Sequence, residues 1–353
     1  MSGQNTSSSS APVVPRLLLA ALVVAGALFL WVVRDALLLG FAAILLAIAV
    51  HGIADALRKL ISMPKGVALA LGALIILAIV GAAIGLFGAQ LAGALNGVLA
   101  RLPEAWESAK QTLEANPIGA VLVEEIERLT SASSADGTVR SMVTSAGGLA
   151  FPLASGVTTA LLVFFAAAFL TTSASAYFHG ALLLFPRGID ENIAEALKAS
   201  AIALRKWLLG ITVDMVLIAL AVGIALWLLG VPAFLGLALI AGIAQFVPTV
   251  GPLVAAIPGV LLAFTVSPMT ALWTAVAYLT ISQLEANLVY PIIQKRAASM
   301  PPALVLLGIL ALGMLLGPLG VLLATPILIV VSVFVTKLYV QNALGKDAAV
   351  PGA

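Results

Sequence analysis

The chain has 353 residues, of which 62% are hydrophobic and 9% charged, with a formal net charge of +2 and no cysteine. So few charges exclude an ordinary water-soluble domain, in which about a quarter of the residues are charged. The lack of cysteine excludes disulfides and thiolate metal sites, and the small net charge argues against a nucleic-acid partner. Apolar runs near the roughly 20 residues needed to cross a bilayer instead predict an all-α, polytopic membrane protein.

The N-terminal part, residues 17–92, is expected to contain three spans. The first two, Leu17–Val33 and Ala36–Val50, are separated only by Arg34 and Asp35, which predicts a tight helical hairpin. Cations next to spans mark the cytoplasmic side under the positive-inside rule. Three such cations follow the second span: Arg58, Lys59 and Lys65.

Residues 93–149 change character, because apolar positions at helical spacing alternate with a mostly acidic face. This pattern predicts an amphipathic helical insertion outside the cytoplasm. A C-terminal transport unit is expected over 150–340. It begins with a fourth span at Ala150–Ala174, continues through an interfacial helix within Tyr177–Lys206, and enters a fifth span at Trp207–Leu229.

The apolar stretch that begins at Val231 is too long for one span and is interrupted near its middle. Proline removes a backbone donor and clashes with the preceding turn. Pro248, Gly251, Pro252 and Pro258 are therefore expected to stop the helix at membrane depth. Non-helical backbone is tolerated there only where it is buried in protein or lines a wet cavity, so a re-entrant hairpin is predicted. The simpler alternative is an ordinary span that kinks.

A second apolar region breaks in the same way at Gly317 and Pro318. Both regions open with Pro-Ala and break at Gly-Pro-Leu, which makes a weak internal repeat. If the basic pairs that begin at Arg205 and Lys295 are both cytoplasmic, the first hairpin enters from outside and the second from inside. Two units of opposite orientation form an inverted repeat, an architecture that builds a substrate site near the midplane. About eight spanning segments are expected in all.

Two carboxyl groups, Asp214 and Glu285, lie within predicted spans. An ionised carboxylate at the bilayer centre costs about 2.5 kcal/mol or more, so such residues normally face a cavity or a partner. Both are therefore candidates for binding substrate or an ion, or for carrying a proton. Neutral polar side chains near them and near the first break are expected to complete the site: Gln245, Thr249, Gln283 and Asn287.

Simpler interpretations of both acids remain open at this point. Asp214 lies about two helical turns from Arg205 and Lys206 and could form a structural ion pair with either. Glu285 could be buried in its protonated form against a neighbouring backbone. Asp55, at the end of a span, is expected to be interfacial.

The chain resembles the autoinducer-2 exporter family of bacterial membrane proteins. The resemblance is carried by the runs Phe246–Leu253, Gln283–Pro291, Met300–Pro302, Gly317–Gly320 and Ala324–Pro326. It covers the C-terminal half strongly and the N-terminal half in layout only. It implies about eight spanning segments with hairpin elements, assembly as a homo-oligomer, and export of small solutes. Thr249 and Val250 depart from the family pattern, so the resemblance leaves the substrate open.

The sequence thus favours a secondary transporter over an enzyme, with no cofactor and no metal. Export of a small polar solute such as autoinducer-2 is the first hypothesis. A sodium or lithium/proton antiporter is the second, and a non-transporting membrane scaffold is the third. An intramembrane protease is remote, because no paired Asp motif or Ser/His dyad is present. The expected location is the bacterial inner membrane, with cytoplasmic tails at 1–16 and 341–353.

Overall fold

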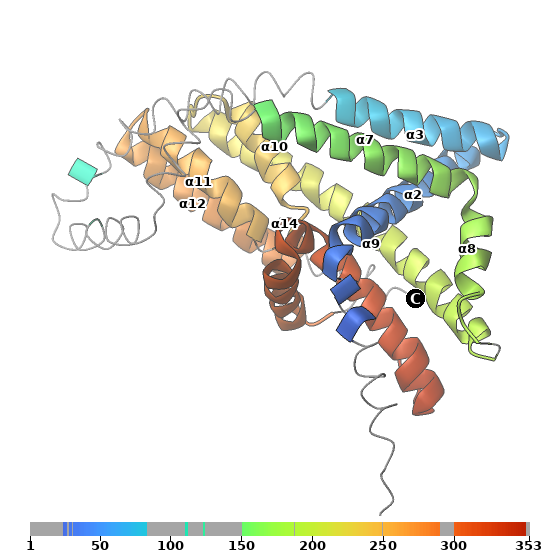
Figure 1. Ribbon diagram of the computed structural model, residues 1–353. Coiled ribbons are helices and arrows are strands. Elements are labelled where there is room, and N and C mark those ends of the chain that lie inside the picture. The colour runs from blue at the N-terminus through green and yellow to red at the C-terminus, as the bar shows by residue number, and fades with distance from the viewer. Residues whose placement is uncertain are drawn as a thin grey trace, which may run out of the picture.

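The computed structural model describes residues 24–26, 28–29, 31–82, 110–111, 123, 150–186, 188–248, 250–289 and 300–350. All regular structure in these ranges is helical, which confirms the predicted all-α fold (Figure 1). Most of the 93–149 insertion, the predicted tail at 1–16, and Thr249 lie outside the described residues. The helices are α2 (Arg34–Leu60), α3 (Lys65–Ala82), α7 (Ala150–Thr172), α8 (Ala174–Leu182), α9 (Asp190–Leu228), α10 (Phe234–Ala244), α11 (Val250–Phe264), α12 (Pro268–Leu284), the π-helix η2 (Glu285–Val289), α14 (Pro302–Phe334) and the π-helix η3 (Val335–Ala343).

Several of these helices have the length and composition of membrane spans. Within the described ranges, three are long and apolar enough to cross a bilayer: Arg34–Leu60, Asp190–Leu228 and Pro302–Ala343. A fourth is added if the bent pair Thr158–Thr172 and Ala174–Leu182 counts as one span. The protein is therefore a multi-pass helical membrane protein.

The N-terminal part departs from the predicted hairpin at Arg34 and Asp35. The amide of Val33 donates to the carbonyl of Phe29, and the amide of Leu37 donates to the carbonyl of Val33. The chain therefore stays helical through this point, and Arg34 and Asp35 lie in the first turn of α2. Two charged residues within a helix do not reverse the chain, because nothing in them breaks the backbone hydrogen-bond ladder. The prediction of a reversal there was wrong.

The helix α9 also differs from the sequence-based prediction. α8 bends away from α7 by 83°, and α9 then runs unbroken for 39 residues from Asp190. A separate interfacial helix ending near Lys206 is therefore wrong: Tyr177 lies in α8, and Lys206 lies inside α9. A charged first half and an apolar second half share one helix because no proline or glycine pair interrupts them.

The first hairpin consists of α10 and α11, with a break at residues 245–249. The turn is tight, since a Cβ added at Gly251 would collide with the carbonyl of Ala244. α11 begins at Val250, so Gly251 and Pro252 occupy its first turn, where a missing backbone donor is tolerated. Pro258 was expected to contribute to the break, but it lies inside α11.

The second hairpin is formed by α14, which folds back on itself at Gly317. Gly317 has φ 69° and ψ −155°, a region of backbone space open essentially to glycine alone. A Cβ at Gly313 would lie 2.7 Å from Val321 Cγ2, and one at Gly308 would collide with the side chain of Leu328. The two arms of α14 therefore pack against each other, and the break predicted at Gly317 and Pro318 is present.

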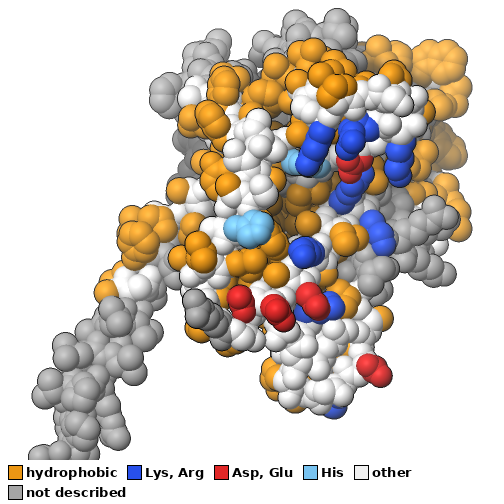
Figure 2. Space-filling view, turned by 90° about the vertical axis from the view of Figure 1, so that its right-hand side faces the viewer, with side chains coloured by type: hydrophobic (Ala, Val, Ile, Leu, Met, Phe, Trp, Pro, Cys, Tyr) orange, Lys and Arg blue, Asp and Glu red, His pale blue; other side chains and the backbone are white. Residues whose placement is uncertain are grey.

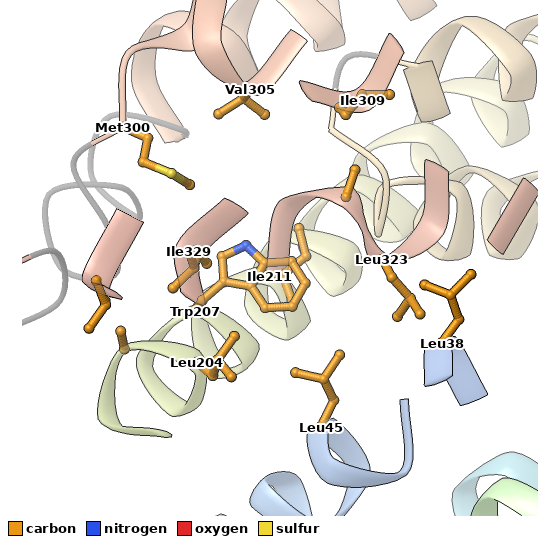
Figure 3. Close-up of a cluster of buried hydrophobic side chains, with 13 residues drawn as sticks. Leu38, Leu45, Leu204, Trp207, Ile211, Met300, Val305, Ile309, Leu323 and Ile329 are labelled. Carbon is orange, nitrogen blue, oxygen red and sulfur yellow. The ribbon is translucent and has the colours of Figure 1, made fainter. Parts of the chain in front are cut away.

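Residues from both helix breaks, at 245–249 and at Gly317, pack against one cluster of buried apolar side chains. Trp207 of α9 lies within it, with its ring edge-to-face against Phe246 at 5.5 Å between centroids. Ile329 of α14 lies next to the indole, and Leu323 of α14 lies beside Leu38 in the same cluster (Figure 3). Leu316, from the second break, packs against the same cluster. The two breaks thus share one apolar core.

Candidate functional site

A close contact between α9 and α10 creates the polar site. A Cβ at Gly242 would lie 2.8 Å from the backbone oxygen of Met215 and 2.8 Å from Cβ of Ala219. Small residues allow membrane helices to approach each other in this way. Gln245 follows Gly242 by about one helical turn and Asp214 precedes Met215, so the contact sets these two side chains next to each other.

Asp214 and Gln245 are joined by a hydrogen bond inside the helix bundle. Gln245 Nε2 donates to Asp214 Oδ2 at 2.9 Å, and the two residues are 2% and 0% exposed. Arg205, an alternative partner considered for Asp214, pairs with Asp55 instead, at 2.6 Å between Nη1 and Oδ2. The alternative of an Asp214–Arg205 ion pair is therefore wrong, and the partner of Asp214 is the side-chain amide of Gln245.

Glu285 brings a third helix to the same place. It opens η2 and is 8% exposed. Its carboxyl group lies near the side chains of Asp214 and Gln245 and interacts electrostatically with both. Short π-helices inside α-helices occur frequently at functional sites, because they reorient side chains locally. Three residues far apart in the sequence, from α9, the first break and η2, therefore form one buried constellation.

This constellation is rich in acceptors and incompletely satisfied. Asp214 Oδ1 and Gln245 Oε1 have no hydrogen-bond partner among the described residues. Two carboxyl groups close together repel each other when both are charged, so a proton, a monovalent cation or a hydrogen-bond donor of a ligand stabilises the pair. In the part of the chain that the structure describes, no group of three or more His, Asp or Glu residues has the geometry of a metal site.

Gln283 and Asn287 do not join this constellation. Both are exposed, and Asn287 Nδ2 donates to the backbone oxygen of Gln283 at 2.7 Å. Residues two positions apart on a helix point about 160° away from each other, so Glu285 faces inward while Gln283 and Asn287 share the opposite, exposed face. The position of Thr249 lies outside the described residues.

The predicted break residues lie beside the site only in the first hairpin. Pro248 and Gly251 are buried and Pro252 is half-buried, directly after Gln245 in the chain. Gly317 and Pro318 turn the second hairpin, whose flanking residues between 303 and 324 are all apolar or glycine. The two hairpins thus differ in chemistry, and only the first supplies a polar side chain at its break.

Two hydroxyl groups on α12 were missed by the sequence-based reasoning. Thr274 and Tyr278 are 0% and 5% exposed, and neither hydroxyl has a hydrogen-bond partner among the described residues. Together with Glu285 they follow the spacing i, i+4 and i+11, which places them on one face of the helix. That spacing was available from the sequence as a signal.

Charged side chains gather on the side of the molecule that carries α8 and the beginning of α9. Figure 2 shows Lys and Arg side chains there, close to acidic ones. Two cross-helix ion pairs are Arg205–Asp55 and Lys337–Glu195, the latter at 3.4 Å. Asp55 is partly exposed, as expected of an interfacial residue. The charges near the C-terminal end of α2 and in the first half of α9 therefore lie near one end of the bundle, away from Asp214.

Known proteins share stretches of this sequence. "Putative transport protein YrrI" and "Putative transport protein YueF", both of Bacillus subtilis (strain 168), are 35% identical over 95 residues and 32% identical over 103 residues. These matches cover 27% and 29% of this chain and 26% and 28% of the relatives. "Putative transport protein MT0215" of Mycobacterium tuberculosis (strain CDC 1551 / Oshkosh) is 29% identical over 171 residues, 48% of this chain and 47% of the relative.

The matched stretches thus span about half or less of the length of these relatives. The model of the AI-2E family transporters matches much more of the chain, residues 18–339. This range includes the Asp214–Gln245–Glu285 constellation and both hairpins. The protein therefore belongs to the AI-2E family of membrane transporters.

Proposed function

We propose that this protein is a secondary exporter that moves a small polar solute across the bacterial inner membrane. The observation that carries the proposal is the buried constellation of Asp214, Gln245 and Glu285, in which two oxygen atoms have no hydrogen-bond partner among the described residues. Buried polar groups in membrane helices are costly, and they commonly mark a substrate or ion pathway. The quorum signal autoinducer-2 is the first candidate solute, because the resemblance described above includes its exporters.

The two hairpins supply a mechanism for exposing the site to one side at a time. In the proposed topology both termini are cytoplasmic, α9 runs outward, the α10–α11 hairpin enters from outside, and α12 returns. The two arms of α14 then form a hairpin of opposite orientation. In inverted repeats of this kind, alternating access arises from movement of one unit against the other around a fixed site.

A second candidate function is sodium or lithium/proton antiport, with Asp214 and Glu285 binding the ion and the proton competitively. The observation that favours it is the electrostatic contact between these two carboxyl groups in a buried site. A single monovalent cation or proton relieves their repulsion, so the two ions exclude each other. Neither function needs a cofactor, and both are compatible with the homo-oligomer that the family resemblance implies.

Purified protein in proteoliposomes tests the two functions. Flux of labelled autoinducer-2 that is lost in Asp214→Asn supports the exporter. Collapse of a pH gradient on addition of sodium or lithium, lost in the same variant, supports the antiporter. Gln283→Ala, on the exposed face next to the site, is the matched control and should retain the parent flux. Absence of any flux in the parent protein would support the third hypothesis, a membrane scaffold.

A further inference from the structure

The buried polar atoms without a protein partner are concentrated in one part of the described structure. The described residues contain five such side-chain atoms. Four of them belong to the unit of α9 to α12: Asp214 Oδ1, Gln245 Oε1, Thr274 Oγ1 and Tyr278 OH. The fifth, Thr171 Oγ1, lies in α7. Buried polar atoms are normally hydrogen-bonded to protein or ordered water, so such a concentration indicates bound water or a ligand.

The Tyr278 hydroxyl lies between α11 and α12. A Cβ at Gly259 would come within 2.6 Å of Tyr278 Cε2 and 2.7 Å of its hydroxyl oxygen, so the ring lies flush against the α11 backbone at a glycine. Ala255 and Ala263, on the same helix, are fully buried near it. Small side chains along α11 thus leave the tyrosine in direct contact with the neighbouring backbone.

Thr274, Tyr278 and Glu285 form a row along one face of α12 and η2. The helical rise of about 1.5 Å per residue separates Thr274 from Tyr278 by about 6 Å and Tyr278 from Glu285 by about 10 Å. Neither hydroxyl has a hydrogen-bond partner among the described residues, so water molecules would have to bridge the positions along the row. In the proposed topology, Thr274 lies nearest the extracytoplasmic end of α12.

We propose that Thr274 and Tyr278 line a narrow hydrated path that carries protons between the Asp214–Glu285 pair and the extracytoplasmic solution. A hydroxyl group can accept one hydrogen bond and donate another, so each can pass on a proton without a net change in charge. A proton that leaves the carboxyl group of Glu285 moves through water to Tyr278, then to Thr274 and to bulk solvent, and leaves a carboxylate behind. The inference rests on the proposed function, because the carboxyl pair is its inner end.

The groups that can titrate along this path are few. Among the described residues of α9 from Trp207 onward, α10, α11, α12 and η2, the titratable side chains are Asp214, Tyr278 and Glu285. No lysine, arginine or histidine faces the path from these elements. A proton on the path therefore has the two carboxyl groups as its only stable acceptors among these elements.

The lack of cysteine makes an accessibility test clean, because each variant carries a single thiol. Thr274→Cys is nearly isosteric and places that thiol on the path. Leu272→Cys is the matched control: it is closer to the outer end of α12, and the native leucine is 57% exposed toward lipid. If reactivity depended only on distance from the outer membrane surface, Leu272→Cys would react faster than Thr274→Cys.

Silver ion, a thiol-reactive cation about as small as a water molecule, is added from the extracytoplasmic side. Thr274→Cys should react at least about tenfold faster than Leu272→Cys, because the reactive thiolate forms only where water reaches the sulfur. Equal or slower reaction, or reaction from the cytoplasmic side alone, overturns the path. If flux in the cysteine-free parent still depends on Asp214, the proposed function survives that outcome.

A second variant tests proton transfer itself. Tyr278→Phe keeps the ring against Gly259 and removes only the hydroxyl group, so it should fold like the parent. Proton-coupled flux should fall about tenfold and become less steeply dependent on external pH, since one relay is lost. Leu279→Ala, one residue further along and 61% exposed, is the control and should retain the parent flux. Parent flux with an unchanged pH profile in Tyr278→Phe overturns the relay.

Discussion

Gln245 Nε2 donates a 2.9 Å hydrogen bond to Asp214 Oδ2, although 31 residues separate the two in sequence and neither is more than 2% exposed. Replacing Gln245 by Leu removes the donor and leaves a buried carboxyl group unpaired. We expect a loss of about 1–3 kcal/mol in unfolding free energy, the usual cost of an unsatisfied buried polar group. Thermal unfolding in detergent measures it. Gln283→Leu makes the same chemical change on the exposed face and should cost much less; equal losses would contradict the account.

The contact at Gly242 should be sensitive to a single methyl group. In Gly242→Ala the new Cβ meets the carbonyl of Met215 and the Cβ of Ala219, both at 2.8 Å. We expect α10 to be displaced from α9 at a cost of about 1–3 kcal/mol, as for other overpacked sites, with reduced transport because Gln245 moves with it. Gly180→Ala, in α8, has nothing within 4 Å and serves as the control. Parent stability and flux in Gly242→Ala would show that the helices are not held this closely.

The stability of the turn at Gly317 should depend on the backbone conformation that glycine allows, and not on the room available for a side chain. A Cβ at Gly317 has nothing within 4 Å, yet φ 69° and ψ −155° are strained for any other residue. Gly317→Ala should therefore lower stability by about 1–3 kcal/mol. Gly66→Ala, with equally open space and an ordinary φ, should be neutral or slightly stabilising. If both variants unfold at the same temperature as the parent, the sharp turn at Gly317 is not formed.

The pair Arg205–Asp55 connects α9 to α2 at the charged end of the bundle. Its side chains are 39% and 43% exposed, so solvent screens the interaction. A double-mutant cycle with Arg205→Gln and Asp55→Asn should give a coupling of up to about 1 kcal/mol that declines as salt is raised. The more exposed pair Lys337–Glu195, at 3.4 Å, should give a smaller value. A coupling free energy that is absent, or that does not change with salt, would show that Arg205 and Asp55 do not form an ion pair in solution.

Much of this architecture follows from local signals in the sequence. Gly317 and Pro318 mark a turn because glycine can adopt backbone conformations closed to other residues and proline removes a helical hydrogen-bond donor, and the structure reverses there. Asp214 and Glu285 were identified because a carboxyl group within an apolar span needs a partner, and the structure brings them together. Signals of this kind depend on one residue type in one environment, so they can be found without knowing the fold.

The remaining features depend on relations between distant segments. Nothing in the sequence near Asp214 indicates that Gln245 is its partner and that Arg205 is engaged by Asp55, because helix packing decides both. Helical spacing sets Glu285 on the face opposite Gln283 and Asn287, but which of the two faces is buried depends on the packing of α12 and η2 against the other helices. Pro258 was expected to break its helix, but α11 accommodates it.

The central claim is that transport depends on the buried pair of carboxyl groups, Asp214 and Glu285, and on the amide of Gln245 bonded to Asp214. Flux into proteoliposomes should be compared for the parent and for four variants at equal protein incorporation: Asp214→Asn, Glu285→Gln, Gln283→Ala and Asn287→Ala. We predict that each of the first two lowers flux at least about tenfold, equivalent to ~1.4 kcal/mol or more of barrier. The other two should stay within about twofold of the parent, because their side chains are exposed. Parent flux in Asp214→Asn and Glu285→Gln, whatever the other two variants do, would contradict the account.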